Sequence, residues 1–124
     1  MSKIMVQTSL RNPEEINDIV HNLEGIKKRN ELIYKEDNTD VLIRIEDVVT
    51  IIRKNEDSEL TLILDVTNET IGTYFIKGVG NLEIKIKTNI LKITNNSIYT
   101  EYELVINNEE IGLFTFETRF EEIE

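Results

Sequence analysis

Six polar side chains of this sequence have the chemistry of a small binding site: three arginines, two tyrosines and one glutamate. An arginine guanidinium presents a rigid fork of N–H donors that fits a carboxylate or a phosphate, and a tyrosine hydroxyl can orient a ligand. If their strands direct these side chains to the lumen or the mouth of one fold, they could bind an anionic small molecule. The six candidates are Tyr34, Glu36, Arg44, Arg53, Tyr102 and Arg119.

The arginines also have an interpretation that involves no ligand. Arg44 and Arg53 could pair with strand glutamates such as Glu36 or Glu46 on the outer surface. An exposed ion pair of that kind contributes only about 0–1 kcal/mol to stability. We favour this interpretation, and the binding site is the alternative hypothesis.

Side chains suited to catalysis or metal binding are scarce. The chain has no cysteine and one histidine, His21, which excludes thiolate chemistry and leaves few routes to an activated nucleophile. Acidic pairs such as Glu109-Glu110 would point to opposite faces of a strand, and Gly78-Val79-Gly80 fits no phosphate-binding loop. We expect no catalytic residue, no metal and no cofactor. An enzyme that uses Arg53, Glu36 and a tyrosine on an anionic substrate is the least favoured hypothesis.

The charge of the chain argues against several classes of partner. The 14 basic and 24 acidic residues give a net charge of −10, whereas nucleic-acid binding needs a clustered basic face. Lys27-Lys28-Arg29 is better interpreted as a solvated turn. No run approaches the roughly 18 apolar residues of a membrane span, and the first residues lack the apolar core of a secretory signal. We expect a cytoplasmic protein that binds neither nucleic acid nor membranes.

The elements that would position the candidates are short β-strands. From about residue 31 onward, runs rich in Ile, Val, Leu, Thr and Tyr alternate with turn residues roughly every 8–12 positions, which is typical of an all-β sandwich or barrel. Asn95-Asn96 and Asn107-Asn108 suit the left-handed backbone of tight hairpins, and such short connections exclude parallel crossovers. The predicted strands are 31–36, 40–46, 48–54, 59–66, 70–77, 81–88, 90–95, 97–106 and 111–121.

Residues 12–24 have two interpretations. Asn12 could cap a helix with Pro13 in its first position, and apolar residues follow at 16, 19, 20 and 23, which is helical spacing. A strand would instead supply the early element that pairs with a late strand to close a barrel. The local pattern alone favours the helix.

Several runs are apolar on both faces, for instance 41–43 and 60–64. A strand with one face in solvent would alternate, so the outer face of these strands should be covered. Either residues 12–24 or a second copy of the chain could cover it. Inside, Phe114, Phe116 and Phe120 lie on one face of the last strand, which favours a filled interior over a hollow one.

The order of these features resembles the YwiB-like family, small bacterial proteins with a calycin-like β-barrel. The match covers residues 30–122, and it departs from the family at Asn55 and Val79, where a glycine and an aromatic residue are common. The resemblance implies one antiparallel up-and-down barrel of about 8–10 strands spanning residues 1–124, with a strand at about 17–24. It brings no established activity. The match rests on Tyr34-x-Glu36, Arg53, Gly80-Asn81-Leu82-Glu83-Ile84 leading to Thr88, and Tyr102.

Two functional hypotheses follow from different features of the sequence. The first is a non-enzymatic module that binds a small molecule at the barrel lumen or mouth through the six candidate residues. The second is a protein-interaction module, in the simplest case a homodimer, that uses the apolar outer faces of its strands.

Overall fold

The fold is a closed ring of ten antiparallel strands. The computed structural model describes the backbone of residues 1–12 and 19–123, and the side chains of the same residues except 19–21. Each strand pairs with its neighbours in sequence, and β1 pairs with β10 to close the ring. The predicted all-β up-and-down barrel is therefore confirmed. The strands are β1 (Ser2–Arg11), β2 (Ile19–Lys28), β3 (Glu31–Glu36), β4 (Thr39–Ile45), β5 (Val49–Lys54), β6 (Ser58–Leu64), β7 (Thr70–Ile76), β8 (Gly80–Ile93), β9 (Ser97–Ile106) and β10 (Glu109–Glu122).

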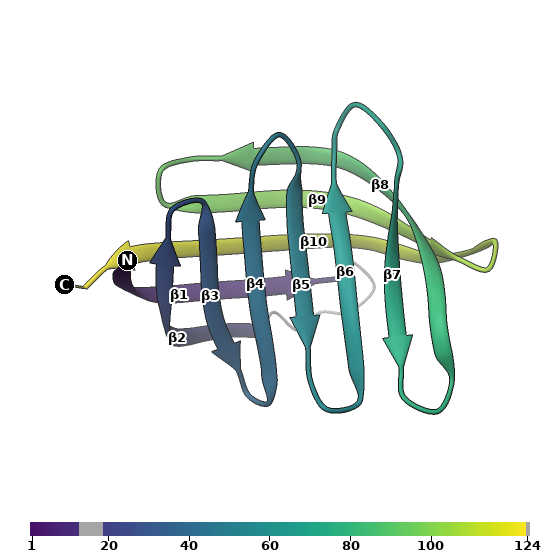
Figure 1. The fold of residues 1–124 in the computed structure, drawn as a ribbon. Coiled ribbons are helices and arrows are strands. Elements are labelled where there is room, and N and C mark those ends of the chain that lie inside the picture. The colour runs from purple at the N-terminus through teal and green to yellow at the C-terminus, as the bar shows by residue number, and fades with distance from the viewer. Residues whose placement is uncertain (13–18, 124) are drawn as a thin grey trace.

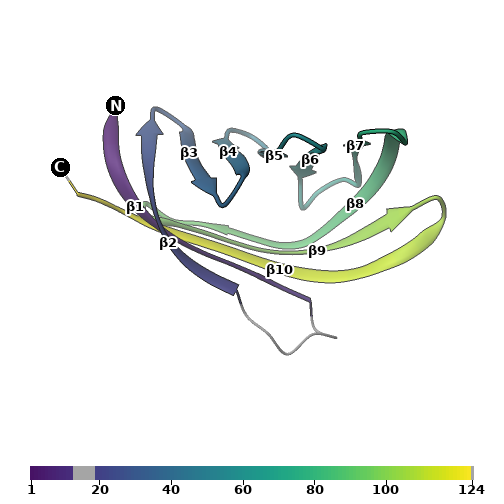
Figure 2. The same cartoon turned by 90° about the horizontal axis from the view of Figure 1, so that it is seen from below.

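The barrel is flattened into two layers. The short strands β3 to β7 form one layer and cross the long strands β9, β10 and β1 of the other at a steep angle, while β2 and β8 curve from one layer into the other (Figure 1, Figure 2). Two sheets that cross in this way bury the inward side chains of both between them. No helix among the described residues is long and apolar enough to cross a membrane.

The core follows from period-two alternation along each strand. In β8, Ile84 and Ile86 are fully buried while Lys85 and Lys87 between them are exposed, because successive side chains of a strand point to opposite faces. Phe116 and the other inward residues of β10 complete the same packing. The buried apolar residues are Ile4, Val6, Leu32, Tyr34, Val41, Ile43, Val49, Ile51, Leu62, Leu64, Ile84, Ile86, Ile98, Tyr102, Phe116 and Phe120.

Residues 19–24 are strand, which confirms the interpretation that the family resemblance implied and shows that the helical one is wrong there. β2 pairs with β1 over residues 19–27 and with β3 over residues 25–28. Those backbone hydrogen bonds link the first strand of the ring to the third, so tertiary pairing overrides the local helical spacing. Residues 13–18, the other part of that prediction, lie outside the described residues.

Three local features differ from the predicted pattern. No strand was expected before residue 17, yet β1 spans Ser2–Arg11. The runs 81–88 and 90–95 form one strand, β8, with a register irregularity between Thr88 and Ile90. Asn107 and Asn108 have the expected positive φ, 52° and 65°, but no positive φ occurs at Asn95-Asn96. That turn is instead held by the Thr94 hydroxyl.

Candidate functional site

Four of the six candidate residues lie on the inner side of the barrel, toward one end of the β3–β5 layer. Tyr34 and Glu36 come from β3, Arg53 from the end of β5, and Tyr102 from β9 on the facing layer. The register places Tyr34 opposite Val41 and Val41 opposite Arg53, so Tyr34 and Arg53 flank β4 on the same face. The alternation of these strands brings the four residues together.

Arg53 and Glu36 form an ion pair across the intervening strand β4. Arg53 Nη1 donates a hydrogen bond to Glu36 Oε2 over 3.0 Å. The two side chains are only 26% and 16% exposed, so the pair lies at the mouth of the barrel, partly shielded from solvent. Shielding strengthens the attraction between the charges but also removes hydration from both groups.

The hydroxyl of Tyr34 is buried without a hydrogen-bond partner, the only such side-chain atom among the described residues. Thr8 and Thr118 lie close by, but their hydroxyls bond to each other, Oγ1 to Oγ1, over 3.2 Å. Burial, and to a smaller extent the negative charge of Glu36, raise the pKa of Tyr34 above its ordinary value of 10.0; the Thr8 and Thr118 hydroxyls, which can hydrogen-bond to the ionised phenol, and the charge of Arg53 lower it in part. Buried polar groups are nearly always paired, so an unpaired hydroxyl is an exception that a bound ligand would explain.

Backbone proximity fixes the position of Tyr34. Gly25 of β2 lies directly opposite it in the register. A Cβ at Gly25 would come within 3.0 Å of Tyr34 Cβ and within 2.7 Å of the Ile33 carbonyl oxygen. Only glycine fits at that distance, so Gly25 allows β2 and β3 to approach closely where Tyr34 enters the interior.

Tyr102 is buried to the same extent as Tyr34. Its ring stacks on that of Phe114 with the centroids 5.8 Å apart, and burial raises the pKa of Tyr102 to about 12, while the positive charge of Arg53 lowers it slightly. The guanidinium of Arg53 therefore acts on both tyrosines. Both phenols are protonated at neutral pH and can donate hydrogen bonds.

The other two candidates, Arg44 and Arg119, lie on the outer surface. Arg44 Nε donates to Glu31 Oε2 over 2.9 Å and lies 3.8 Å from Glu46 Oε1, so it forms a surface ion pair of the kind that the favoured interpretation expects, with Glu31 as the nearer partner. Arg119 lies 3.5 Å from Glu117, two residues away on β10. Neither contributes to the interior cluster.

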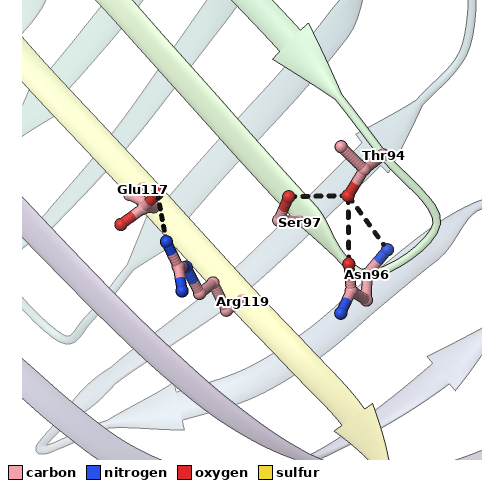
Figure 3. Close-up of polar contacts among 5 residues, drawn as sticks. All are labelled: Thr94, Asn96, Ser97, Glu117 and Arg119. Atoms are coloured by element: carbon pink, nitrogen blue, oxygen red, sulfur yellow. Dashed lines mark hydrogen bonds and ion pairs between the residues drawn. The ribbon is translucent and has the colours of Figure 1, made fainter.

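Figure 3 shows the surroundings of Arg119 at the outer side of β10. The guanidinium turns toward Glu117, and in the adjacent β8–β9 turn the Thr94 hydroxyl contacts Asn96 and Ser97, with 2.6 Å between the two hydroxyl oxygens. These polar groups satisfy one another. The arrangement stabilises a turn and a strand surface, and it adds nothing to the site at the other face of β10.

Thr8 and Thr118 belong to the interior cluster but were not among the candidates. Both are at most 4% exposed and occupy opposite positions in the β1–β10 pair that closes the barrel. The sequence indicates their inward direction only by spacing. Thr8 comes two residues after the inward Val6, and Thr118 comes two residues after the inward Phe116, so each shares the face of that apolar residue. Threonine is common on both faces of strands, so this signal is weak without the register.

A polar cleft opens between the β3–β4 and β5–β6 turns, and its lining includes the sequence neighbours Lys35 and Lys54 but neither Glu36 nor Arg53. It has a volume of about 590 Å³, within the range of small-ligand sites. The described residues contain no group of three or more His, Cys, Asp or Glu that could hold a metal ion. The cleft is lined by Lys35, Asn38, Asp40, Lys54, Asn55, Glu56 and Asp57.

Comparison with known proteins places the fold and the family. The structure is similar to the crystal structure of the ywiB protein from Bacillus subtilis, with a TM-score of 0.59 and 13% sequence identity over 98% of this chain and 91% of that one. At that identity the similarity shows the fold. No curated protein matches the chain. Residues 4–117 match the family described as Domain of unknown function (DUF1934), so the chain belongs to this YwiB-like family.

Proposed function

We propose that the barrel binds a small molecule through a carboxylate or phosphate group at the mouth beside Arg53. The observation that carries this proposal is the buried Tyr34 hydroxyl, which has no hydrogen-bond partner among the described residues although Arg53 lies on the same face, on the far side of β4. A buried hydroxyl left unpaired costs free energy. A ligand oxygen between the guanidinium and the phenol would pair it and gain charge-assisted hydrogen bonds.

The guanidinium has the capacity for a second acceptor. An arginine carries five N–H donors, and even a bidentate pair with Glu36 would use only two of them. Glu36, 3.0 Å away, would orient the guanidinium in the free protein. The electrostatic repulsion between Glu36 and an incoming anion would limit affinity, so we expect binding of moderate strength.

The interior limits the size of the ligand. Apolar side chains from every part of the ring fill the barrel, so only a small molecule, or the polar end of a larger one, could reach Tyr34 from the mouth. The tyrosines would serve as neutral donors. Because burial raises the pKa of both phenols, neither is activated as a base or a nucleophile at neutral pH, which supports binding over catalysis.

Titration of the ¹⁵N-labelled protein with acetate, succinate and inorganic phosphate tests this proposal. The Nε–H signal of Arg53 should shift in a saturable way with at least one of these anions. Arg44 provides the matched control, because it also pairs with a glutamate of β3, at 2.9 Å, but on the outer face. The result that would overturn the proposal is no saturable shift at Arg53, or an equal shift at both arginines.

A further inference from the structure

The outer face of β2, β3 and β4 carries the same charge pattern on each strand. An apolar residue is preceded by an acid two positions earlier and followed by a base two positions later. Residues at this spacing share one face of a strand. The three segments are Glu24-x-Ile26-x-Lys28, Glu31-x-Ile33-x-Lys35 and Asp40-x-Leu42-x-Arg44.

The strand register aligns the apolar residues into one row. Ile26 lies opposite Ile33, Ile33 opposite Leu42, and Leu42 opposite Ile52 of β5. These four residues are the apolar row. Ile26 and Ile33 are 39% and 38% exposed, and no described element lies over this face of the layer (Figure 2). Leu42 and Ile52 are half-buried, so the row is an apolar stripe that is most exposed at Ile26 and Ile33 and lies between two rows of mostly charged residues.

The charges beside the apolar row nearly balance. The three acids are matched by three bases on the same strands, and Lys54 of β5 flanks Ile52 as a fourth base, so this face carries +1 whereas the whole chain carries −10. The acidic excess therefore lies elsewhere in the chain, and a second copy of so acidic a chain meets little net repulsion at this face. Within one chain, neighbouring antiparallel strands place opposite charges side by side, as in the Arg44–Glu31 pair.

We propose that this face binds a second copy of the chain about a two-fold axis that runs along the apolar row. Such a rotation lays each strand over its own equivalent with the direction reversed. The apolar row then packs on itself, and each acid faces the base of the same strand in the other copy. Glu31 faces Lys35 of the partner subunit, and Lys35 faces Glu31 of the partner subunit, as a self-complementary interface requires.

The area predicts a weak dimer. Four strands spaced about 4.8 Å apart and five residues rising about 3.4 Å each give a footprint of roughly 300–400 Å². Stable interfaces bury about 800 Å² per partner. An adjoining groove that contains the exposed side chain of Ile123 extends the face beyond β2. We expect association that depends on concentration and becomes measurable in the high micromolar range.

Reciprocal charge variants test the axis. In a homodimer of Lys35→Glu, residue 35 would face Glu31 twice; in a homodimer of Glu31→Lys, residue 31 would face Lys35 twice. Each variant should self-associate about ten-fold more weakly than wild type, as expected for two exposed pairs changed from attractive to repulsive. An equimolar mixture should recover association near the wild-type level, because both contacts between unlike variants are again attractive.

Sedimentation velocity between about 10 μM and about 1 mM, with thermal unfolding to confirm that each variant folds, gives the readout. Lys87→Glu is the matched control: it makes the same charge change on β8, away from the apolar row, and should self-associate like wild type. A wild-type monomer throughout the range would overturn the proposal. Equal association of all variants, or no recovery in the mixture, would also overturn it and assign the face to a different partner.

Discussion

Replacement of Tyr34 by phenylalanine should stabilise the protein. The substitution removes only the hydroxyl oxygen, which is buried and has no partner among the described residues. The ring remains in the interior of the barrel, and the close approach of Gly25 to the Tyr34 Cβ is unchanged. The change therefore isolates the free energy of one buried polar group.

The magnitude follows from the desolvation of that group. A buried hydroxyl without a partner costs about 1–3 kcal/mol relative to a paired one, and the void left by one oxygen offsets part of the gain. We expect the free energy of unfolding to rise by about 1 kcal/mol. For a domain of this size, that corresponds to an increase in Tm of about 3–5 °C.

Urea unfolding at neutral pH, together with calorimetry, measures both quantities. Thr8→Val provides a contrast of opposite sign. Thr8 and Thr118 share the hydrogen bond of 3.2 Å between their hydroxyls, so the valine leaves the Thr118 hydroxyl without that bond and should lower the free energy of unfolding by about 1–2 kcal/mol. Both substitutions keep the shape of the side chain, so packing changes little.

A loss of 1 kcal/mol or more in Tyr34→Phe would refute this reasoning, because it would mean that the hydroxyl is satisfied in solution. The same result would remove the observation on which the proposed ligand site rests. The opposite result would be a Tyr34→Phe variant that is more stable but binds more weakly to the anion that shifts the Arg53 signal. It would show that the buried hydroxyl destabilises the free barrel and contacts the ligand.

Three further predictions concern stability. Burial raises the pKa of Tyr102 to about 12 in the folded state, against 10.0 in the unfolded chain. The free energy of unfolding should therefore be unaffected below pH 10 and fall by about 2–3 kcal/mol as the pH rises to about 12. In urea unfolding, Tyr102→Phe should lack this part of the decline. Arg53→Met should cost about 1–3 kcal/mol and Arg44→Met less than about 1 kcal/mol in the same assay, because the Arg53 pair is the more buried. Gly72→Ala places a Cβ 2.2 Å from a backbone oxygen and should lower Tm far more than Gly78→Ala, where nothing lies within 4 Å and only the positive φ opposes alanine.

Most of the barrel could be predicted because its later strands are delimited by local signals. Alternation identifies the buried face of β8 without reference to any other strand, and paired asparagines mark the β9–β10 hairpin. The irregularity between Thr88 and Ile90 has no comparable signal, because it depends on how β8 pairs with β9. β1 was missed because its mixture of apolar and polar residues resembles many chain termini until β10 is available as its partner.

The site could be predicted in its residue types but only partly in its geometry. Arg44 lies between Ile43 and Ile45, and Arg53 follows Ile51 and Ile52, so both arginines occur in runs with apolar residues on both faces. Such runs carry no parity signal to show which face an arginine occupies. Strand pairing decides the face. Arg44 lies directly opposite Glu31 and forms a surface ion pair, whereas Arg53 reaches Glu36 across β4 on the inner side.

Both proposals depend on the register of β3 to β5. Successive residues of β3 alternate between the two surfaces: Tyr34 and Glu36 enter the interior, while Ile33 and Lys35 lie on the outer face. The Arg53–Glu36 pair spans β4 and would be broken by a slip of one residue, which would also move the apolar row inward and the tyrosine outward. The interior ion pair therefore also helps to fix the outer charge pattern. We expect Arg53→Met to disturb self-association only to the extent that it disturbs this register, whereas Glu31→Lys, whose site lies outside the cleft lining, should leave the Arg53 Nε–H titration unchanged.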